Sequence, residues 1–278
     1  MPRSRLVPGA EVVPVPGHGL ALRTPDGEFL RVRAPGGDEE AALLTRLAGG
    51  DPVPAGREPA RVVAAFEDAG YLTDAAGPPP WPAARQDVCL LGDPVLTAPL
   101  AAQLTALGAR PRTAGDDADL LDLTGSAPAA VVWCLDGPVP DGLWDAADRL
   151  PEHGIAWLRC HREGWQAYTE PLAAAPGDVT SAHVRGRRLA ATPAHRELAA
   201  YWRGPRTGGA PAAPGTPGAA LLAALLADDL HRWATGAPHH HGLPPRRRLR
   251  RVDLRTLTVT EHPVLPVPPV APSPKRDG

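Results

Sequence analysis

The segment with the clearest chemical signature is a short loop near residue 90. The run Val88-Cys89-Leu90-Leu91 predicts a buried strand, and Gly92-Asp93-Pro94 follows it where a doubly wound sheet would bind a nucleotide. A phosphate-binding turn of this kind uses three glycines and free backbone N–H groups. Here only Gly92 is kept, Asp93 would repel a phosphate, and Pro94 removes a donor. The residues predict an ordinary strand-to-helix turn and no bound cofactor.

The metal-ligating residue types do not form a zinc pattern. Structural zinc sites use Cys or His pairs two to four residues apart, whereas Cys89, Cys134 and Cys160 stand far apart. All three lie in apolar runs, which is typical of buried free thiols. The consecutive histidines at 239–241 are typical of a solvated loop. We therefore expect no metal site and no disulfide framework.

Neither of the remaining polar features indicates catalysis. His161, beside Cys160, could act as a base, but no nucleophile matches it. We expect no catalytic residue. The basic run at 246–251 predicts an exposed loop that leads into a strand, with contact to an acidic peptide or nucleic acid as the alternative. No aromatic residue interrupts the run, which weakens the nucleic-acid interpretation.

Composition sets broad limits on the class of protein. The chain has 278 residues, 43% of them hydrophobic, and a formal net charge of -2. A core is therefore expected, without any global attraction to nucleic acid or anionic membranes. The sequence contains no apolar run of about 18 residues and no N-terminal signal segment. We expect a cytoplasmic protein with no membrane or nucleic-acid partner.

The N-terminal part has the pattern of a small module with three strands followed by helices. Strands are predicted at 11–15, 20–23 and 28–33, the last two joined by the turn Thr24-Pro25-Asp26-Gly27. Helices are predicted over 38–47 and 58–69, the second with Val62, Val63 and Phe66 on one side. This order is typical of a winged-helix-like fold.

A proline-rich run separates this module from the rest of the chain. We place a first domain at 1–76, a linker at 77–86 and a second domain at 87–278. Beyond the linker, strands and helices alternate. Strands are predicted at 88–91, 120–123, 130–135, 155–160, 165–172 (an edge strand) and 252–259, and helices at 96–107, 143–150, 199–202 and 218–235. The alternation predicts a doubly wound α/β domain.

Particular stretches of the first domain resemble a known family. The segment from Asp26 to Val32, the run from Leu43 to Gly50 and the run from Phe66 to Leu72 look like a RiPP recognition element. That is a winged-helix module that binds the leader peptides of ribosomally made natural products.

The second domain is similar to degenerate ThiF-like (E1-like) proteins that work beside YcaO cyclodehydratases in azole-containing peptide and thiopeptide pathways. The turn Leu91-Gly92-Asp93 carries the likeness, with the Ala-Leu helix ending at Gly236 and the tail from Val252 to Pro268. Many relatives bind zinc through CxxC pairs. Here Val270 and Ser273 stand at the last pair, and residues 179–185 hold no cysteine.

The resemblance implies a non-catalytic adaptor that binds a precursor's leader and delivers it to a YcaO-type cyclodehydratase for azoline formation. In such modules the leader adds as a strand to the sheet edge, beside the last helix. The residues implied to contact the leader are Glu28, Phe29, Leu30, Arg31, Val32 and Arg33 on the edge strand, and Val62, Val63 and Phe66 on the helix.

Three alternatives stay open. An active ATP-dependent E1-like adenylating enzyme would turn over ATP, and a Rossmann-type oxidoreductase would bind a nicotinamide cofactor. A winged-helix DNA-binding regulator would need a basic recognition helix, yet residues 57–72 carry Glu58, Glu67 and Asp68 against two arginines. The sequence also leaves a homodimer open.

Overall fold

We analysed a computed structural model of the chain, which describes residues 5–33, 38–50, 57–74, 79–114, 127–204, 207–209, 213–237 and 242–267, the side chains of residues 57 and 58 excepted. The chain divides into two compact units, Met1–Pro79 and Pro80–Gly278. The strand expected at 120–123, the histidines at 239–241, and Val270 and Ser273 lie outside the described residues. The assignment of the two parts to particular domain families stays a prediction.

Unit 1 combines a three-stranded antiparallel sheet with two helices. The sheet has the order β2-β3-β4, with β2 at Glu11–Val15, β3 at Gly19–Arg23 and β4 at Phe29–Val32. The helices are α1 (Asp38–Leu47) and α2 (Arg57–Asp68). Two short strands, β1 (Arg5–Leu6) and β5 (Leu72–Thr73), pair with each other. The predicted strands and helices of this part are confirmed within one or two residues.

Alternation of side chains along the strands creates the core of unit 1. Leu20 and Leu22 of β3 face the helices and are buried against Leu43, Leu47 and Phe66. Residues one position away, such as Ala21, therefore lie on the opposite face of the sheet. Thr24 begins the turn into β4, since its N–H donates to the Glu28 carbonyl oxygen at 2.8 Å and its hydroxyl accepts from the Glu28 N–H.

Unit 2 contains a seven-stranded mixed sheet with the order β12-β11-β10-β9-β8-β6-β7. The strands are β6 (Asp87–Gly92), β7 (Arg110–Thr113), β8 (Ala130–Leu135), β9 (Ala156–Glu163), β10 (Gln166–Thr169), β11 (Arg248–Asp253) and β12 (Thr258–Pro263). The helices are α3 (Pro94–Ala106), α5 (Ser181–Ala191), α6 (His195–Arg203) and α7 (Gly215–Thr235). Short 3-10 turns lie at Ala83–Arg85, Ala147–His153 and Pro245–Arg247.

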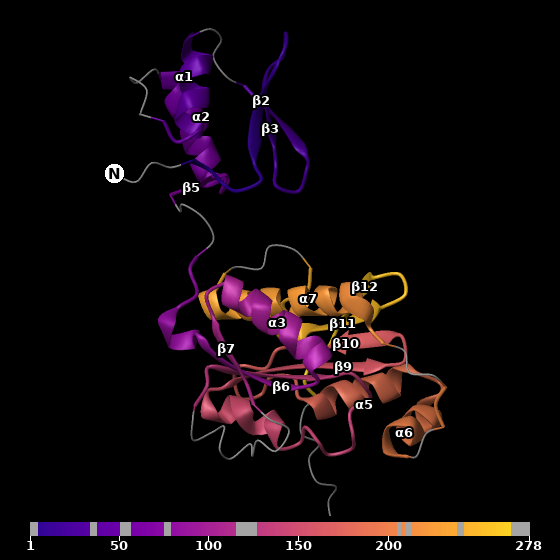
Figure 1. The fold of residues 1–278 in the computed structure, drawn as a ribbon. Coiled ribbons are helices and arrows are strands. Elements are labelled where there is room, and N and C mark those ends of the chain that lie inside the picture. The colour runs from indigo at the N-terminus through magenta and orange to yellow at the C-terminus, as the bar shows by residue number, and fades with distance from the viewer. Residues whose placement is uncertain are drawn as a thin grey trace, which may run out of the picture. The chain divides into compact units, whose positions relative to one another are not determined.

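The sheet of unit 2 is parallel in one half and antiparallel in the other. Strands β7, β6, β8 and β9 run parallel, whereas β10, β11 and β12 pair antiparallel. Helices α3 and α7 cover one face, and α5 and α6 lie on the other (Figure 1). The expected α/β class is therefore confirmed, although only half of the sheet has the parallel arrangement of a doubly wound fold.

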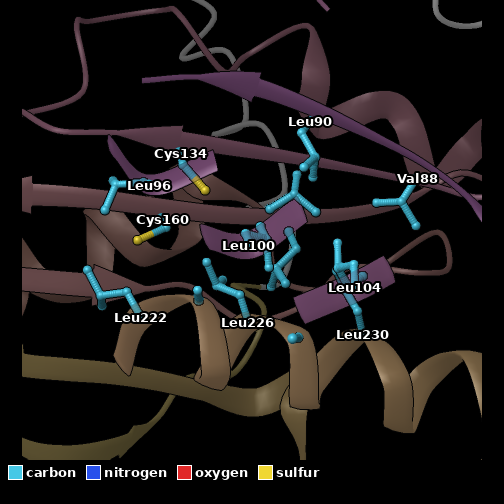
Figure 2. Packing of buried hydrophobic residues seen from close by; sticks show 14 of the residues in the cluster. Val88, Leu90, Leu96, Leu100, Leu104, Cys134, Cys160, Leu222, Leu226 and Leu230 are labelled. Carbon is cyan, nitrogen blue, oxygen red and sulfur yellow. The ribbon is translucent and has the colours of Figure 1, made fainter. Parts of the chain in front are cut away.

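The largest apolar core lies between the sheet and the helix pair α3 and α7. Leu90 of β6 and Cys134 of β8 point toward Leu100 of α3 and Leu226 of α7 (Figure 2). A smaller cluster on the opposite face is built around Trp144 and the fully buried Trp157. Burial on both faces explains why the central strands read as continuous apolar runs.

Three predicted elements of unit 2 were wrong in detail, and two elements were missed. The helix expected over 143–150 is instead a series of turns followed by the 3-10 helix Ala147–His153. The strand expected at the sheet edge over 165–172 is β10, which lies inside the sheet between β9 and β11. The single strand expected over 252–259 is instead a hairpin, in which β11 turns at residues 254–257 into β12 and Leu257 adopts a positive φ of 57°. Helix α5 and strand β7 were not predicted, because arginines interrupt any apolar pattern in both.

A buried carboxylate joins α7 to the antiparallel half of the sheet. Asp229 on α7 accepts hydrogen bonds from the guanidinium groups of Arg248 and Arg250 on β11. All three side chains are 5% exposed. Glu261 on β12 contacts both arginines as well, with Arg248 Nη1 at 3.1 Å from its Oε1. The interior of this half is therefore held by charge as well as by apolar packing.

None of the helices in the described part of the chain combines the length and the apolar character that crossing a bilayer requires.

Candidate peptide-binding groove

Strand β4 forms an edge of the sheet in unit 1. It pairs with β3 through the registers Leu22↔Leu30 and Leu20↔Val32, and none of the described strands pairs with its other side. The Glu28 carbonyl points to β3, because it accepts from the Thr24 N–H. Both backbone groups of a residue in an antiparallel strand point to the same side, and the side alternates. Phe29, Arg31 and Arg33 therefore direct their N–H and C=O groups away from the sheet.

A groove runs beside this edge, between β4 and α2. Its volume is about 510 Å³, which is within the range typical of ligand sites. The groove is lined by Leu22, Leu30, Arg31, Val32, Arg33, Arg61, Val62, Ala65, Phe66, Ala69 and Tyr71. The floor is apolar, and three arginines supply the charge. An extended peptide would find unpaired backbone groups, an apolar surface and positive charge in this one place.

The structure brings most of the predicted leader-contacting residues together. Leu30, Arg31, Val32, Arg33, Val62 and Phe66 line the groove. Phe66 is buried at its base and meets the ring of Tyr71 edge-on at 6.2 Å. Three predicted residues lie elsewhere. Glu28 belongs to the turn before β4, Val63 packs against the core, and Phe29 is 64% exposed on the opposite face of the sheet.

Sequence reasoning missed part of the helical wall. Arg61, Ala65 and Ala69 follow each other at intervals of four along α2 and its C-terminal end, so they share one side of the helix. The spacing was visible, but small alanines and a charged residue do not stand out in an apolar pattern. The small side chains of Ala65 and Ala69 leave the groove open.

The loop after β6, at the position where a doubly wound sheet would bind a nucleotide, is closed by its own residues. Gly92 has a φ of +96°, and a Cβ atom there would lie 2.0 Å from the carbonyl oxygen of Cys134. Asp93 directs its carboxylate to the backbone N–H of Asp136 at 2.6 Å, and its carbonyl oxygen accepts from the N–H groups of Leu96 and Thr97. A carboxylate thus occupies the place where a phosphate would need donors.

Gly92→Ala is expected to destabilise unit 2 by about 2–3 kcal/mol, because the new Cβ meets a backbone atom in a conformation that L side chains rarely adopt. Chemical denaturation would measure the loss. Gly186→Ala is the matched control, since a Cβ at that helical position meets nothing within 4 Å. The control should gain about 0.5–1 kcal/mol. Equal stability of the two variants would contradict the close approach of β6 and β8.

His161 lies in a buried charged cluster beneath α5 and α6. Its ring stacks on Tyr168 at 5.1 Å and stands between two carboxylates, Glu163 and Glu170, at 3.5 and 3.7 Å. Burial raises the pKa of Glu170. Burial also acts to raise the pKa of Glu163, but hydrogen bonds from His161 and Arg188 hold it well below its usual range.

The contacts of this cluster join α5 and α6 to the sheet. Arg188 of α5 donates to both oxygens of Glu163 at 3.0 and 2.6 Å. The indole N–H of Trp202 on α6 donates to the same carboxylate at 2.7 Å. These bonds link two helices to β9, which is a packing role.

The cysteines are free and buried, and Cys134 of β8 lies directly opposite Cys160 of β9. A hydrogen bond with Cys160, together with burial, raises the pKa of the Cys134 thiol. A thiol with a raised pKa stays protonated and is a poor nucleophile, which disfavours a catalytic role for Cys134. Within the described residues, no group of three or more His, Cys, Asp or Glu side chains has a metal-binding arrangement.

Only the middle of the basic run is buried, so the expected exposed loop that leads into a strand was wrong for Arg248 and Arg250. Arg246 pairs with the Asp178 carboxylate. Arg248 and Arg250 are buried in β11 beside Asp229. Arg251 is exposed and donates to the Gln166 side chain at 2.8 Å. The buried arginines of the run, Arg248 and Arg250, therefore contribute to the packing of unit 2.

Comparison with known proteins yields similarity in structure only. No protein-family model matches the chain, and no curated protein matches it. Among solved structures, the heterocyclase TruD aligns with a TM-score of 0.63 at 18% identity, over 96% of this chain and 42% of its own. A heterocyclase in complex with substrate and cofactor aligns with a TM-score of 0.61 at 16% identity, over 96% of this chain and 39% of its own.

E. coli MccB aligns with a TM-score of 0.55 at 9% identity, over 95% of both chains. At these identities the likeness is one of fold. The chain spans 39–42% of the length of the two heterocyclase chains, so it corresponds to part of them.

Proposed function

We propose that this chain is a non-catalytic adaptor of ribosomal peptide biosynthesis. In this proposal unit 1 is a RiPP recognition element of winged-helix type, which holds a precursor's leader as a fourth strand on β4. Unit 2 is a degenerate ThiF-like domain that docks a YcaO-type cyclodehydratase. The observation that carries the proposal is the groove between the unpaired edge of β4 and helix α2.

The other described edges of the two larger sheets support strand addition at β4. Proline removes a ladder donor, so it blocks pairing wherever its nitrogen faces outward. The edges at β2, β7 and β12 each contain one, at Pro14, Pro111 and Pro263. Strand β4, with the sequence Phe-Leu-Arg-Val, has none.

Backbone hydrogen bonds place these prolines on the outward side. Arg110 donates to the Gln86 carbonyl just before β6, and Ala114 donates to Leu90 of β6. Backbone groups alternate in direction along a strand, so Pro111 faces away from β6. Val264 donates to the Arg247 carbonyl, so Pro263 faces away from β11. Since Leu20 and Leu22 direct their backbone groups to β4, the same alternation along β2 turns Pro14 outward. The β4 edge is thus the one among these four that offers an uninterrupted ladder.

The features of unit 2 favour a partner over chemistry. Asp93 fills the loop that would hold a nucleotide, which disfavours the adenylating and oxidoreductase alternatives. The fold is shared with heterocyclase chains, which supports a place in azoline formation. A leader held on unit 1 would raise the local concentration of core Cys, Ser or Thr residues at a docked enzyme, to about millimolar for a short flexible linker.

A reconstitution tests this function. The purified chain is expected to hold no zinc and hydrolyse no ATP, yet to be required for azoline formation by a YcaO-type enzyme on a precursor with its leader attached. Mass spectrometry would follow the loss of water from the precursor. About one zinc per chain, ATP turnover by the chain alone, or azolines formed without it would each contradict the adaptor role.

Arg31→Ala/Arg33→Ala is expected to weaken binding of an acidic leader several-fold, because partly exposed ion pairs contribute about 0.2–1 kcal/mol each. Fluorescence polarisation at several salt concentrations would also show a shallower salt dependence. Arg23→Ala is the control, since this arginine lies on β3 outside the groove and pairs with Glu11 at 3.8 Å. An unchanged salt dependence would mean that the two arginines are merely solvated.

A further inference from the structure

Strand β4 exposes apolar side chains on both of its faces. Phe29 is 64% exposed and the adjacent Leu30 is 42% exposed. Because successive side chains of a strand point to opposite faces, Leu30 faces α2 and Phe29 faces the outer side of the sheet. Contiguous exposed apolar surface is typical of interaction sites.

The outer face beside β4 is hollowed. The hollow has a volume of about 290 Å³ and is lined by Val15, His18, Leu20, Ala21, Phe29, Leu30 and Arg31. It lies over the first half of the central strand, where this face carries only the small residues Gly19 and Ala21. The larger side chains of Phe29 and Val15 line it from the two neighbouring strands. Leu30 and Arg31 line both this hollow and the groove beside α2. The two recesses therefore flank the same edge from opposite sides.

We propose that the peptide bound on β4 is read on both faces of the sheet, by the groove beside α2 and by the outer hollow beside Phe29. This inference rests on the proposed function. A peptide strand that pairs with Phe29, Arg31 and Arg33 sends alternate side chains to the two faces. Its recognised segment should therefore contain two adjacent apolar residues, one for each recess, rather than a simple apolar-polar alternation.

Charge at the edge adds to this pattern. Arg31 lies on the outer face, opposite Ala21, and borders both recesses. An acidic residue of the peptide next to the apolar pair would meet this guanidinium across the strand. The ligand class is thus an extended peptide with an adjacent apolar pair and a neighbouring carboxylate.

The test begins with a random dodecapeptide library displayed on mRNA and selected on the full chain. We expect enriched peptides to carry adjacent apolar pairs. The best peptide is then labelled, and its affinity measured for the wild type and for Phe29→Ser, Leu30→Ser and Val13→Ser. Val13 is the matched control because it lies on the same outer face, 36% exposed, on the far strand β2.

We expect Phe29→Ser and Leu30→Ser each to weaken binding about three- to fivefold and Val13→Ser to leave it unchanged. Replacing each apolar residue of the peptide by Ala should show coupling of one to Phe29 and of the other to Leu30. Since Phe29 is exposed, its replacement should leave circular dichroism unchanged.

Two results would overturn the inference in different ways. Peptides that depend on the β4 edge but bind Phe29→Ser with unchanged affinity would show that only the groove beside α2 is read, and strand addition would stand. Failure of the wild-type chain to enrich any peptide would overturn the proposed function together with this inference.

Discussion

Arg31→Pro is expected to weaken peptide binding by at least about tenfold while unit 1 stays folded. Arg31 directs its backbone N–H outward, away from β3. Proline there removes the central donor of the open edge and places its ring against an incoming strand. A net backbone hydrogen bond contributes about 0.5–1.5 kcal/mol, and the steric block adds to this loss. Prolines on the outward side of an edge strand are tolerated.

The control for this substitution is Arg31→Ala, which removes the same charge and keeps the N–H. Fluorescence polarisation would compare the two variants with the wild type, and circular dichroism would check folding. Val32→Pro is a poorer test, because Val32 pairs with Leu20 inside the sheet and packs against the core. Equal affinities of Arg31→Pro and Arg31→Ala would exclude strand addition at β4.

Asp229→Ala is expected to lower the free energy of unfolding by about 3–5 kcal/mol. The substitution leaves Arg248 and Arg250, each 5% exposed, without their main counterion. Breaking a buried ion pair by removing one partner is costly because the remaining charge stays desolvated. Urea denaturation of the full chain, followed by circular dichroism, would measure the change.

The neighbouring residue supplies a matched control. Asp228 precedes Asp229 on α7 but is 46% exposed, and it pairs with Arg232 one turn away at 2.9 Å. Asp228→Ala should cost no more than about 0.3–0.5 kcal/mol. Comparable losses in the two variants would contradict the expectation that the buried ion pairs of Asp229 stabilise the fold more than the exposed pair of Asp228.

Elements whose apolar spacing reflects a buried face were predicted well. Leu43 and Leu47 in α1, and Val62 and Phe66 in α2, show helical spacing because those helices bury one side against the sheet. The apolar run of β8 is continuous because both of its faces are covered. In such segments the local pattern and the tertiary packing require the same residues.

The prediction failed where burial depends on charge partners far away in the chain. Arg248 and Arg250 read as an exposed basic run, since their partner Asp229 is contributed by a distant helix. Helix α5 was missed because its inward side uses Arg188, which is held by Glu163 of β9. An element whose buried side is held by ion pairs shows no apolar periodicity in the sequence from which it could be predicted.

The candidate site was predictable in its strand and only partly in its helix. Residues of β4 stand out through their alternation and the turn before them, and Leu30 and Val32 line the groove. The opening beside α2, by contrast, depends on what is small, namely Ala65 and Ala69. A groove is a property of the assembled surface, and no single residue type in the sequence indicates it.

The proline-free edge of β4 has a consequence for the behaviour of the protein in solution. An unpaired strand edge can accept any extended backbone, including the same strand of a second molecule. Self-pairing through β4 and occupancy by peptide would use the same N–H and C=O groups of Phe29, Arg31 and Arg33. A β4 strand cannot do both at once, so self-association and peptide binding compete for the same free protein. A saturating ligand would thus act as a solubiliser, and apparent affinity would fall as the protein stock becomes more concentrated.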